Sequence, residues 1–267
     1  MTFESQSRLV PNGEFDELAT LDTQQDVLLL AHGWLCDRAR AGELISYFRA
    51  QLAPIPVHGI YWPSKPGHAE GVVRAGIDNA SYYHMKTRAG AVGAIGLAPC
   101  LQTLHHRQPN LRLHLAGHSF GARLVTAAVS ALPPGIVRSL TLIQAAFSQF
   151  AFEPTGAFYN VLDPRRVTGP ILVTHSSHDK AVGFAYPVAS RLAHQNASAL
   201  GDKSDPYGGL GRNGAPHAPT VPLADLVQLR AHLAAPILNL ESSAIIGSHT
   251  DINHPAVADA IRAAMNS

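Results

Sequence analysis

The stretch Leu111-Arg-Leu-His-Leu-Ala-Gly-His-Ser-Phe-Gly121 decides how this sequence is interpreted. Its first six residues alternate apolar and polar side chains, which predicts a β-strand, and residues 123–132 have a helical pattern. The pattern G-x-S-x-G therefore stands at a strand-to-helix junction, where it forms a sharp turn with an exposed serine hydroxyl. Small residues are needed on both sides of such a turn, and Gly117 and Gly121 supply them. We interpret Ser119 as a nucleophile; the alternative is a serine that only begins a helix after a glycine-rich turn.

An acidic side chain is expected after this serine. A serine hydroxyl is a poor nucleophile until a base takes its proton, and an acid must hold that base. In enzymes whose serine nucleophile sits on such a turn, the order along the chain is nucleophile, acid, histidine. Asp179 follows the apolar run at residues 170–174 and is the favoured acid, although it could instead cap the segment after it. Asp163, Asp202 and Asp205 are weaker candidates, because none of them directly follows a strand-like run.

The base should lie in a loop after the last strand. Residues 245–255 offer two histidines, His249 and His254. His249 lies two residues past Gly247, whereas His254 directly precedes Pro255 and suits a helix boundary. We therefore favour His249 and keep His254 as the alternative.

Backbone N–H donors are expected to bind the developing oxyanion. One donor is the N–H of Phe120, the residue after the nucleophile. The second is the N–H of Trp34, in the loop His32-Gly33-Trp34 that follows an apolar run at residues 26–31. Gly33 would let the backbone approach closely. An ordinary strand-ending turn is the alternative interpretation of this loop.

The rest of the chain alternates short apolar runs with longer amphipathic ones, which predicts a mostly parallel sheet covered on both faces. The expected strands are residues 26–31, 57–62, 111–116, 137–145, 169–174 and 236–247, and the expected helices are residues 40–53, 83–106, 123–132 and 255–264. Nothing divides the chain, so we expect one domain over residues 1–267. A small cap is expected around residues 147–168, where aromatic residues gather, and a flexible surface loop is expected around residues 201–222.

Composition argues against several classes of protein. Hydrophobic residues make up 46% of the 267 residues and charged residues 15%, which argues against disorder. The formal net charge of +1 argues against nucleic acid or an anionic membrane as partner. Two cysteines and an N-terminus without an apolar run favour a cytoplasmic location. No apolar run approaches the ~20 residues of a membrane span. The fifteen histidines lack metal-ligand spacing, so we expect neither metal nor cofactor.

These motifs together resemble the α/β-hydrolase superfamily, over roughly residue 26 to the C-terminus. Gly117 to Gly121 resembles its nucleophile elbow, and His32-Gly33-Trp34 resembles its oxyanion loop of the single-glycine type. Asp179 and His249 fall where that superfamily has its acid and base. The resemblance implies an α/β fold with a central, mostly parallel sheet of about eight strands, and usually hydrolysis of an acyl bond without a cofactor.

The sequence thus predicts a serine hydrolase that cleaves an ester-type acyl bond of a small molecule through Ser119, His249 and Asp179. Two alternatives stay open. A peptidase or amidase would use the same three residues on a worse leaving group, and a binding protein on the same fold would need no working base.

Overall fold

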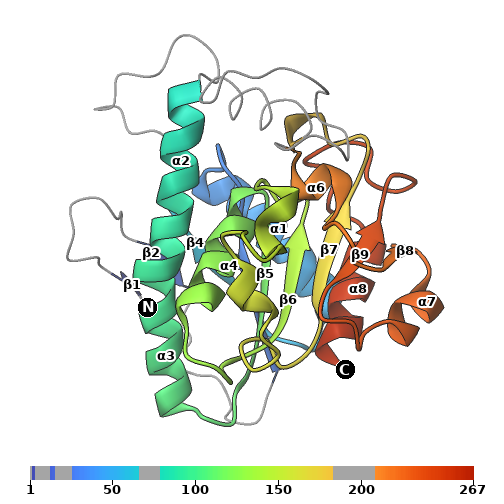
Figure 1. Ribbon diagram of the computed structural model, residues 1–267. Coiled ribbons are helices and arrows are strands. Elements are labelled where there is room, and N and C mark those ends of the chain that lie inside the picture. The colour runs from blue at the N-terminus through green and yellow to red at the C-terminus, as the bar shows by residue number, and fades with distance from the viewer. Residues whose placement is uncertain (1, 4–12, 16–25, 66–78, 183–207) are drawn as a thin grey trace.

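The computed structural model describes residues 2–3, 13–15, 26–65, 79–182 and 208–267, and its centre is a mixed β-sheet (Figure 1). Nine strands of these described residues join the sheet in the order β1-β2-β4-β3-β5-β6-β7-β9-β8. The strands are β1 (Thr2–Phe3), β2 (Gly13–Phe15), β3 (Asp26–Ala31), β4 (Val57–Tyr61), β5 (Arg112–His118), β6 (Val137–Ile143), β7 (Ile171–His175), β8 (Thr220–Pro222) and β9 (Leu238–Glu241). In this spatial order, the seven neighbouring strands β4-β3-β5-β6-β7-β9-β8 pair in parallel. The strands β1 and β2 pair antiparallel and extend the sheet beyond β4.

Helices cover both faces of this sheet. On one face lie α2 (Asn79–Ala91), the π-helical segment η2 (Val92–Leu97), α3 (Ala98–Arg107) and α4 (Phe120–Ala131). On the other lie α1 (Arg38–Leu52), α7 (Leu226–Ala231) and α8 (Pro255–Met265). Short helical turns η3 (Gln149–Phe152), η4 (Tyr159–Leu162) and α6 (Leu210–Asn213) occupy the connections. The predicted α/β architecture, a mostly parallel sheet between two helical layers, is confirmed.

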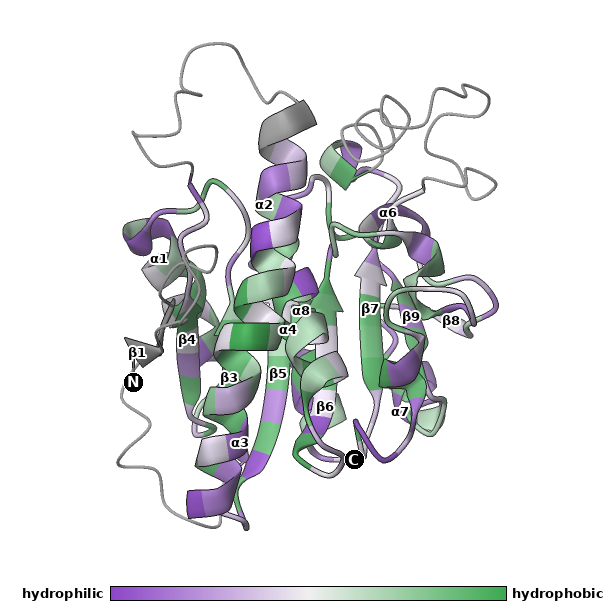
Figure 2. Cartoon of the chain, turned by 60° about the vertical axis from the view of Figure 1, so that its left-hand side comes forward, coloured by the Kyte–Doolittle hydropathy of each residue, from purple (hydrophilic) through white to green (hydrophobic). Residues whose placement is uncertain are grey.

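Burial on both faces explains the apolar strand sequences. In β3, Val27 and Leu29 pack into the core under α2 to α4, while Leu28 and Leu30 pack under α1 and α8. Alternate side chains of a strand point to opposite faces, so a strand covered on both sides must be apolar throughout. Figure 2 shows this pattern as mostly green central strands.

The long helix predicted at residues 83–106 is present as α2, η2 and α3 in succession, which form one rod beside the sheet (Figure 1). Its small-residue-rich middle has a packing cause. A Cβ on Gly93 would collide with the backbone carbonyl of Leu124 in α4. Glycine at this position therefore lets the rod and α4 approach each other closely.

Three parts of the sheet differ from the sequence prediction. Residues 220–222, expected in a loop, form the edge strand β8, which pairs with β9. The strand expected over residues 236–247 is only β9, because the chain turns away after Glu241. The strands β1 and β2 were not predicted at all. Of the loop expected around residues 201–222, residues 201–207 lie outside the described residues.

No helix among the described residues has both the length and the apolar character needed to cross a membrane. The parallel strands matter for function because their carboxyl ends share one edge of the sheet. The segments after β3, β5, β7 and β9 all leave from that edge, and they carry the residues singled out in the sequence.

Candidate active site

Ser119 occupies the turn between β5 and α4. Its backbone has φ 59° and ψ −122°, a conformation that costs an ordinary residue about 1–3 kcal/mol. A Cβ on Gly117 would collide with the carbonyl of Gly121, and a Cβ on Gly121 would collide with the carbonyl of Ala31. Both glycines are therefore required by close backbone approach. The turn is held by the Ser119 N–H, which donates to the carbonyl of Ile143 at 3.0 Å.

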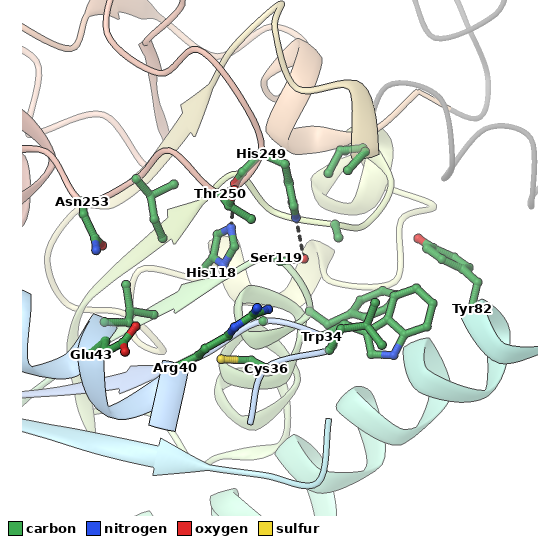
Figure 3. Close-up of a pocket in the computed structure, with 18 residues that line it drawn as sticks. Trp34, Cys36, Arg40, Glu43, Tyr82, His118, Ser119, His249, Thr250 and Asn253 are labelled. Atoms are coloured by element: carbon green, nitrogen blue, oxygen red, sulfur yellow. Dashed lines mark hydrogen bonds between the residues drawn. The ribbon is translucent and has the colours of Figure 1, made fainter. Parts of the chain in front are cut away.

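The structure brings Ser119, His249 and Asp179 into one hydrogen-bonded chain (Figure 3 shows the Ser119–His249 bond). His249 Nε2 lies 2.8 Å from Ser119 Oγ, and His249 Nδ1 lies 2.8 Å from Asp179 Oδ2. Asp179 is a carboxylate acceptor, so His249 Nδ1 carries the hydrogen, and Nε2 is left to accept the proton of the serine hydroxyl. The three residues come from the segments after β5, β7 and β9, which meet at the same edge of the sheet.

Asp179 is completely buried, and its carboxylate is satisfied by donors from three directions. Oδ1 accepts the N–H of Val182 at 2.8 Å, and Oδ2 accepts both His249 Nδ1 and the side-chain amide of Gln144, the latter at 3.1 Å. These hydrogen bonds fix the direction in which the carboxylate of Asp179 faces the histidine.

The other acid and base candidates lie elsewhere in the fold or outside the described residues. His254 caps α8, where its Nδ1 accepts the N–H of Ala256 at 3.2 Å. Asp163 pairs with Arg165, and hydrogen bonds from the side chain and the backbone N–H of Arg165 lower the pKa of Asp163 to about 2. Asp202 and Asp205 lie outside the described residues.

The loop His32-Gly33-Trp34 is held in place by the imidazole of His32. Its Nε2 accepts the N–H of Trp62 at 3.2 Å, so Nδ1 carries the hydrogen and donates to the carbonyl of Gly33 at 3.0 Å. Burial lowers the pKa of His32 to about 4, which keeps this donor-and-acceptor form at neutral pH. In a trans peptide the N–H points opposite to the C=O. Fixing the Gly33 carbonyl therefore also fixes the direction of the Trp34 N–H.

Trp34 and Phe120 both line the cavity beside Ser119. Within the part of the chain that the structure describes, neither backbone N–H donates a hydrogen bond to the protein. Glycine at position 33 lets the loop lie close to the turn that carries Ser119, since a Cβ on Gly33 would lie 3.0 Å from both the Ser119 Cβ and the His118 Nδ1. Ser64 supports the loop from outside, because its carbonyl accepts the Leu35 N–H at 3.0 Å and its Oγ donates to the Cys36 carbonyl at 2.7 Å.

Sequence reasoning missed two residues of this site. His118, the variable residue before the serine, donates from Nε2 to the backbone carbonyl of His249 at 2.8 Å, and the two rings lie 4.8 Å apart. Burial, followed by the charge of His249, lowers the pKa of His118 to about 3. Gln144, which binds Asp179, has φ 45° directly after β6. A polar residue that ends an apolar strand at the functional edge was the available signal for Gln144.

The structure buries two further histidines, His114 in β5 and His175 in β7. The imidazole of His114 lies between Ser139 and Asp26, at 2.7 and 2.9 Å. No group of three His, Cys, Asp or Glu side chains among the described residues could hold a metal ion.

The cavity that holds Ser119 has a volume of about 600 Å³ and two chemically different ends. Trp34 and Tyr82 lie on one side of Ser119, and Arg40, Glu43 and Asn253 lie on the other (Figure 3). The aromatic residues expected to form a cap do not line this cavity. One of them, Phe147, packs instead against Phe152 and Phe158, with ring centroids 6.1 and 5.4 Å apart.

No family model and no curated protein matches the sequence, whereas solved structures of similar fold exist. The fold is similar to that of a protein from Thermus thermophilus, with 15% identity and a TM-score of 0.46 over 100% of this chain and 97% of that one. It is also similar to that of a poly(3-hydroxybutyrate) depolymerase from Bordetella parapertussis, with 14% identity and a TM-score of 0.46 over 93% of this chain and 81% of that one. A third similar structure is a lidless serine hydrolase from Xanthomonas campestris, with 13% identity and a TM-score of 0.45 over 98% of this chain and 90% of that one.

Proposed function

We propose that the protein is a serine hydrolase that cleaves a carboxylic ester-type bond of a small molecule by acyl transfer. One observation carries the proposal: His249 bridges the hydroxyl of Ser119 and the buried carboxylate of Asp179, with both contacts at 2.8 Å. Such a chain of nucleophile, base and orienting acid activates a hydroxyl that is otherwise unreactive. A strained turn and two buried donors to Asp179, the Gln144 amide and the Val182 N–H, hold the chain in place, which is the preorganisation that catalysis needs.

In the proposed first step, Ser119 Oγ attacks the carbonyl carbon while its proton passes to His249 Nε2. Asp179 remains ionised and stabilises the imidazolium that forms, and it keeps the ring in the orientation that accepts the proton. The negative charge that develops on the carbonyl oxygen binds to the N–H groups of Trp34 and Phe120. One such donor contributes about 3 kcal/mol to stabilising the transition state.

In the second half of the reaction, His249 gives its proton to the leaving oxygen, and the acyl group remains on Ser119 as an ester. A water molecule then attacks this acyl-enzyme while His249 takes its proton. His249 returns that proton to Ser119 Oγ as the bond between Oγ and the acyl carbon breaks, and the acid is released. The reaction needs no redox step and no group beyond these side chains and backbone donors.

Steady-state kinetics with chromogenic substrates test the proposal. We expect wild type to hydrolyse p-nitrophenyl butyrate, and Ser119→Ala to lose at least ~10⁴-fold in kcat while unfolding at the same temperature. Aminoacyl p-nitroanilides should be cleaved far more slowly than the ester, and the opposite preference would make the peptidase alternative correct. A folded Ser119→Ala protein with the wild-type rate would refute the role of the serine.

A further inference from the structure

A second cavity of about 310 Å³ contains two cationic side chains, Lys86 from α2 and Arg123 from α4. Its remaining lining combines three phenylalanine rings with small and hydroxyl-bearing residues: Phe147, Phe150, Phe158, Ser148, Thr155, Ala151, Gly156 and Ala157. Among the described residues that line it, none is Asp or Glu. The structure half-buries Lys86.

The elements that line this cavity also line the Ser119 cavity. Three elements each supply one residue to the Ser119 cavity and a near neighbour to the second: Tyr82 and Lys86 from α2, Phe120 and Arg123 from α4, and Ala146 and Phe147 after β6. Residues three or four apart on a helix share a face and lie about one turn, or ~5.4 Å, apart along the axis. Lys86 and Arg123 therefore lie about one helical turn beyond Tyr82 and Phe120, two residues that line the Ser119 cavity.

The two cations are held near each other by packing. Arg123 Nε donates to the backbone carbonyl of Lys86 at 2.9 Å, and its guanidinium lies 5.4 Å from the ring of Phe158. The ammonium of Lys86 lies 5.7 Å from the ring of Tyr83. Burial, and then the charge of Arg123, lower the pKa of Lys86 to about 8. Both side chains carry N–H donors, and a carboxylate accepts charge-assisted hydrogen bonds from ammonium and guanidinium groups.

The acyl part of a substrate is the part that would reach this cavity. The leaving oxygen must take a proton from His249, so the leaving group faces the end lined by Thr250 and Asn253, the residues that follow His249 (Figure 3). The acyl chain then extends past Trp34 and Tyr82, toward the second cavity.

We propose that Lys86 and Arg123 form an anion subsite and that the preferred acyl group ends in a carboxylate, as in a monoester of a dicarboxylic acid. The inference rests on the proposed function, since it assumes acyl transfer at Ser119. The phenylalanine rings contact the methylene chain, and the two cations bind the terminal carboxylate. Ser119 cleaves the ester bond at the other end of the chain.

Matched ester pairs with a constant leaving group test this subsite. The p-nitrophenyl monoesters of adipate, suberate and sebacate are compared with the p-nitrophenyl esters of hexanoate, octanoate and decanoate, each corrected for hydrolysis without enzyme. We expect wild type to prefer the carboxylate-ended member of at least one pair by about tenfold or more in kcat/KM, and this preference to weaken with added salt.

Variants of Lys86 attribute the preference to the cavity. Lys86→Met should remove it by raising KM for the carboxylate-ended esters, with the neutral esters unchanged, and Lys86→Glu should reverse it. Arg230→Met removes one positive charge from the exposed face of α7 and should keep the preference. Equal rates for both series in wild type, or a preference that survives both Lys86 variants, would overturn the inference while leaving the proposed function intact.

A binding measurement separates failure of the subsite from failure of catalysis. Suberate should bind the Ser119→Ala protein in titration calorimetry, and about tenfold more weakly when Lys86→Met is added. If no ester is cleaved yet suberate binds in this manner, the proposed function fails and the anion site stands. Absence of suberate binding would refute the anion site.

Discussion

Replacement of His118 by leucine tests whether this buried histidine positions the base. His118 Nε2–H donates to the backbone carbonyl of His249 at 2.8 Å, and the side chain is almost fully buried and neutral at neutral pH. His118→Leu removes the donor but no charge, and it keeps most of the apolar volume beside Ser119. The carbonyl of His249 is then left without that bond.

The structure sets the size of the expected effect. A buried polar group that loses its partner costs about 1–3 kcal/mol, and the segment that carries His249 can recover part of this cost only by moving. Movement displaces Nε2 from its position 2.8 Å from Ser119 Oγ. Since 1.4 kcal/mol corresponds to tenfold in rate, we expect kcat to fall roughly 10- to 100-fold, with a smaller change in KM.

The assay compares His118→Leu with His118→Gln on p-nitrophenyl butyrate, with thermal unfolding measured in parallel. A glutamine amide can donate to the same carbonyl, so His118→Gln should recover most of kcat. The reasoning would be refuted if both variants lost kcat equally, or if His118→Leu lowered only the unfolding temperature.

Three further predictions concern stability, the base and the free thiol. Burial depresses the pKa of His32 to about 4 and of His118 to about 3, so below pH ~6.5 the unfolded chain binds more protons at these sites than the folded one. Denaturant titrations should therefore show stability falling as pH drops from ~6.5 to ~4, by about 1 kcal/mol per pH unit for each histidine, and less steeply in His118→Gln; a flat profile would contradict the burial argument. His249→Ala should lose at least ~10³-fold in kcat whereas His254→Ala should keep substantial activity, and the reverse result in ester kinetics would reassign the base. Burial raises the pKa of Cys36, so iodoacetamide should modify it slowly at neutral pH, and the modified protein should lose activity because the thiol lines the Ser119 cavity; full activity after stoichiometric labelling by mass would exclude this.

Local patterns were enough to predict the fold and to nominate the three central residues of the candidate site. A parallel strand buried on both faces must be apolar, so β3 and β7 were visible as uninterrupted runs. The elbow around Ser119 needs two glycines at a fixed spacing, because the backbones of Gly117 and Gly121 pass too close for a Cβ. Requirements of this kind are local, and they are therefore written in the sequence.

Interactions between distant segments were not predictable in this way. His118 and His249 are 131 residues apart, and nothing near either residue indicates that a ring nitrogen of one meets the carbonyl of the other. The strand β8 has a single buried residue, Val221, between Thr220 and Pro222, and it exists only because β9 offers it a partner. The proximity of Lys86 and Arg123 could not be predicted either, because the two residues come from different helices.

Activation of Ser119 is the central claim, and labelling by a fluorophosphonate tests it most directly. Wild type and Ser119→Ala are treated in parallel and their intact masses are measured. Fluorophosphonates react with serines whose hydroxyl proton is taken by a base, so we expect a single adduct on wild type and none on the variant. A folded wild-type protein that takes up no adduct, or an adduct that persists in Ser119→Ala, would contradict the account.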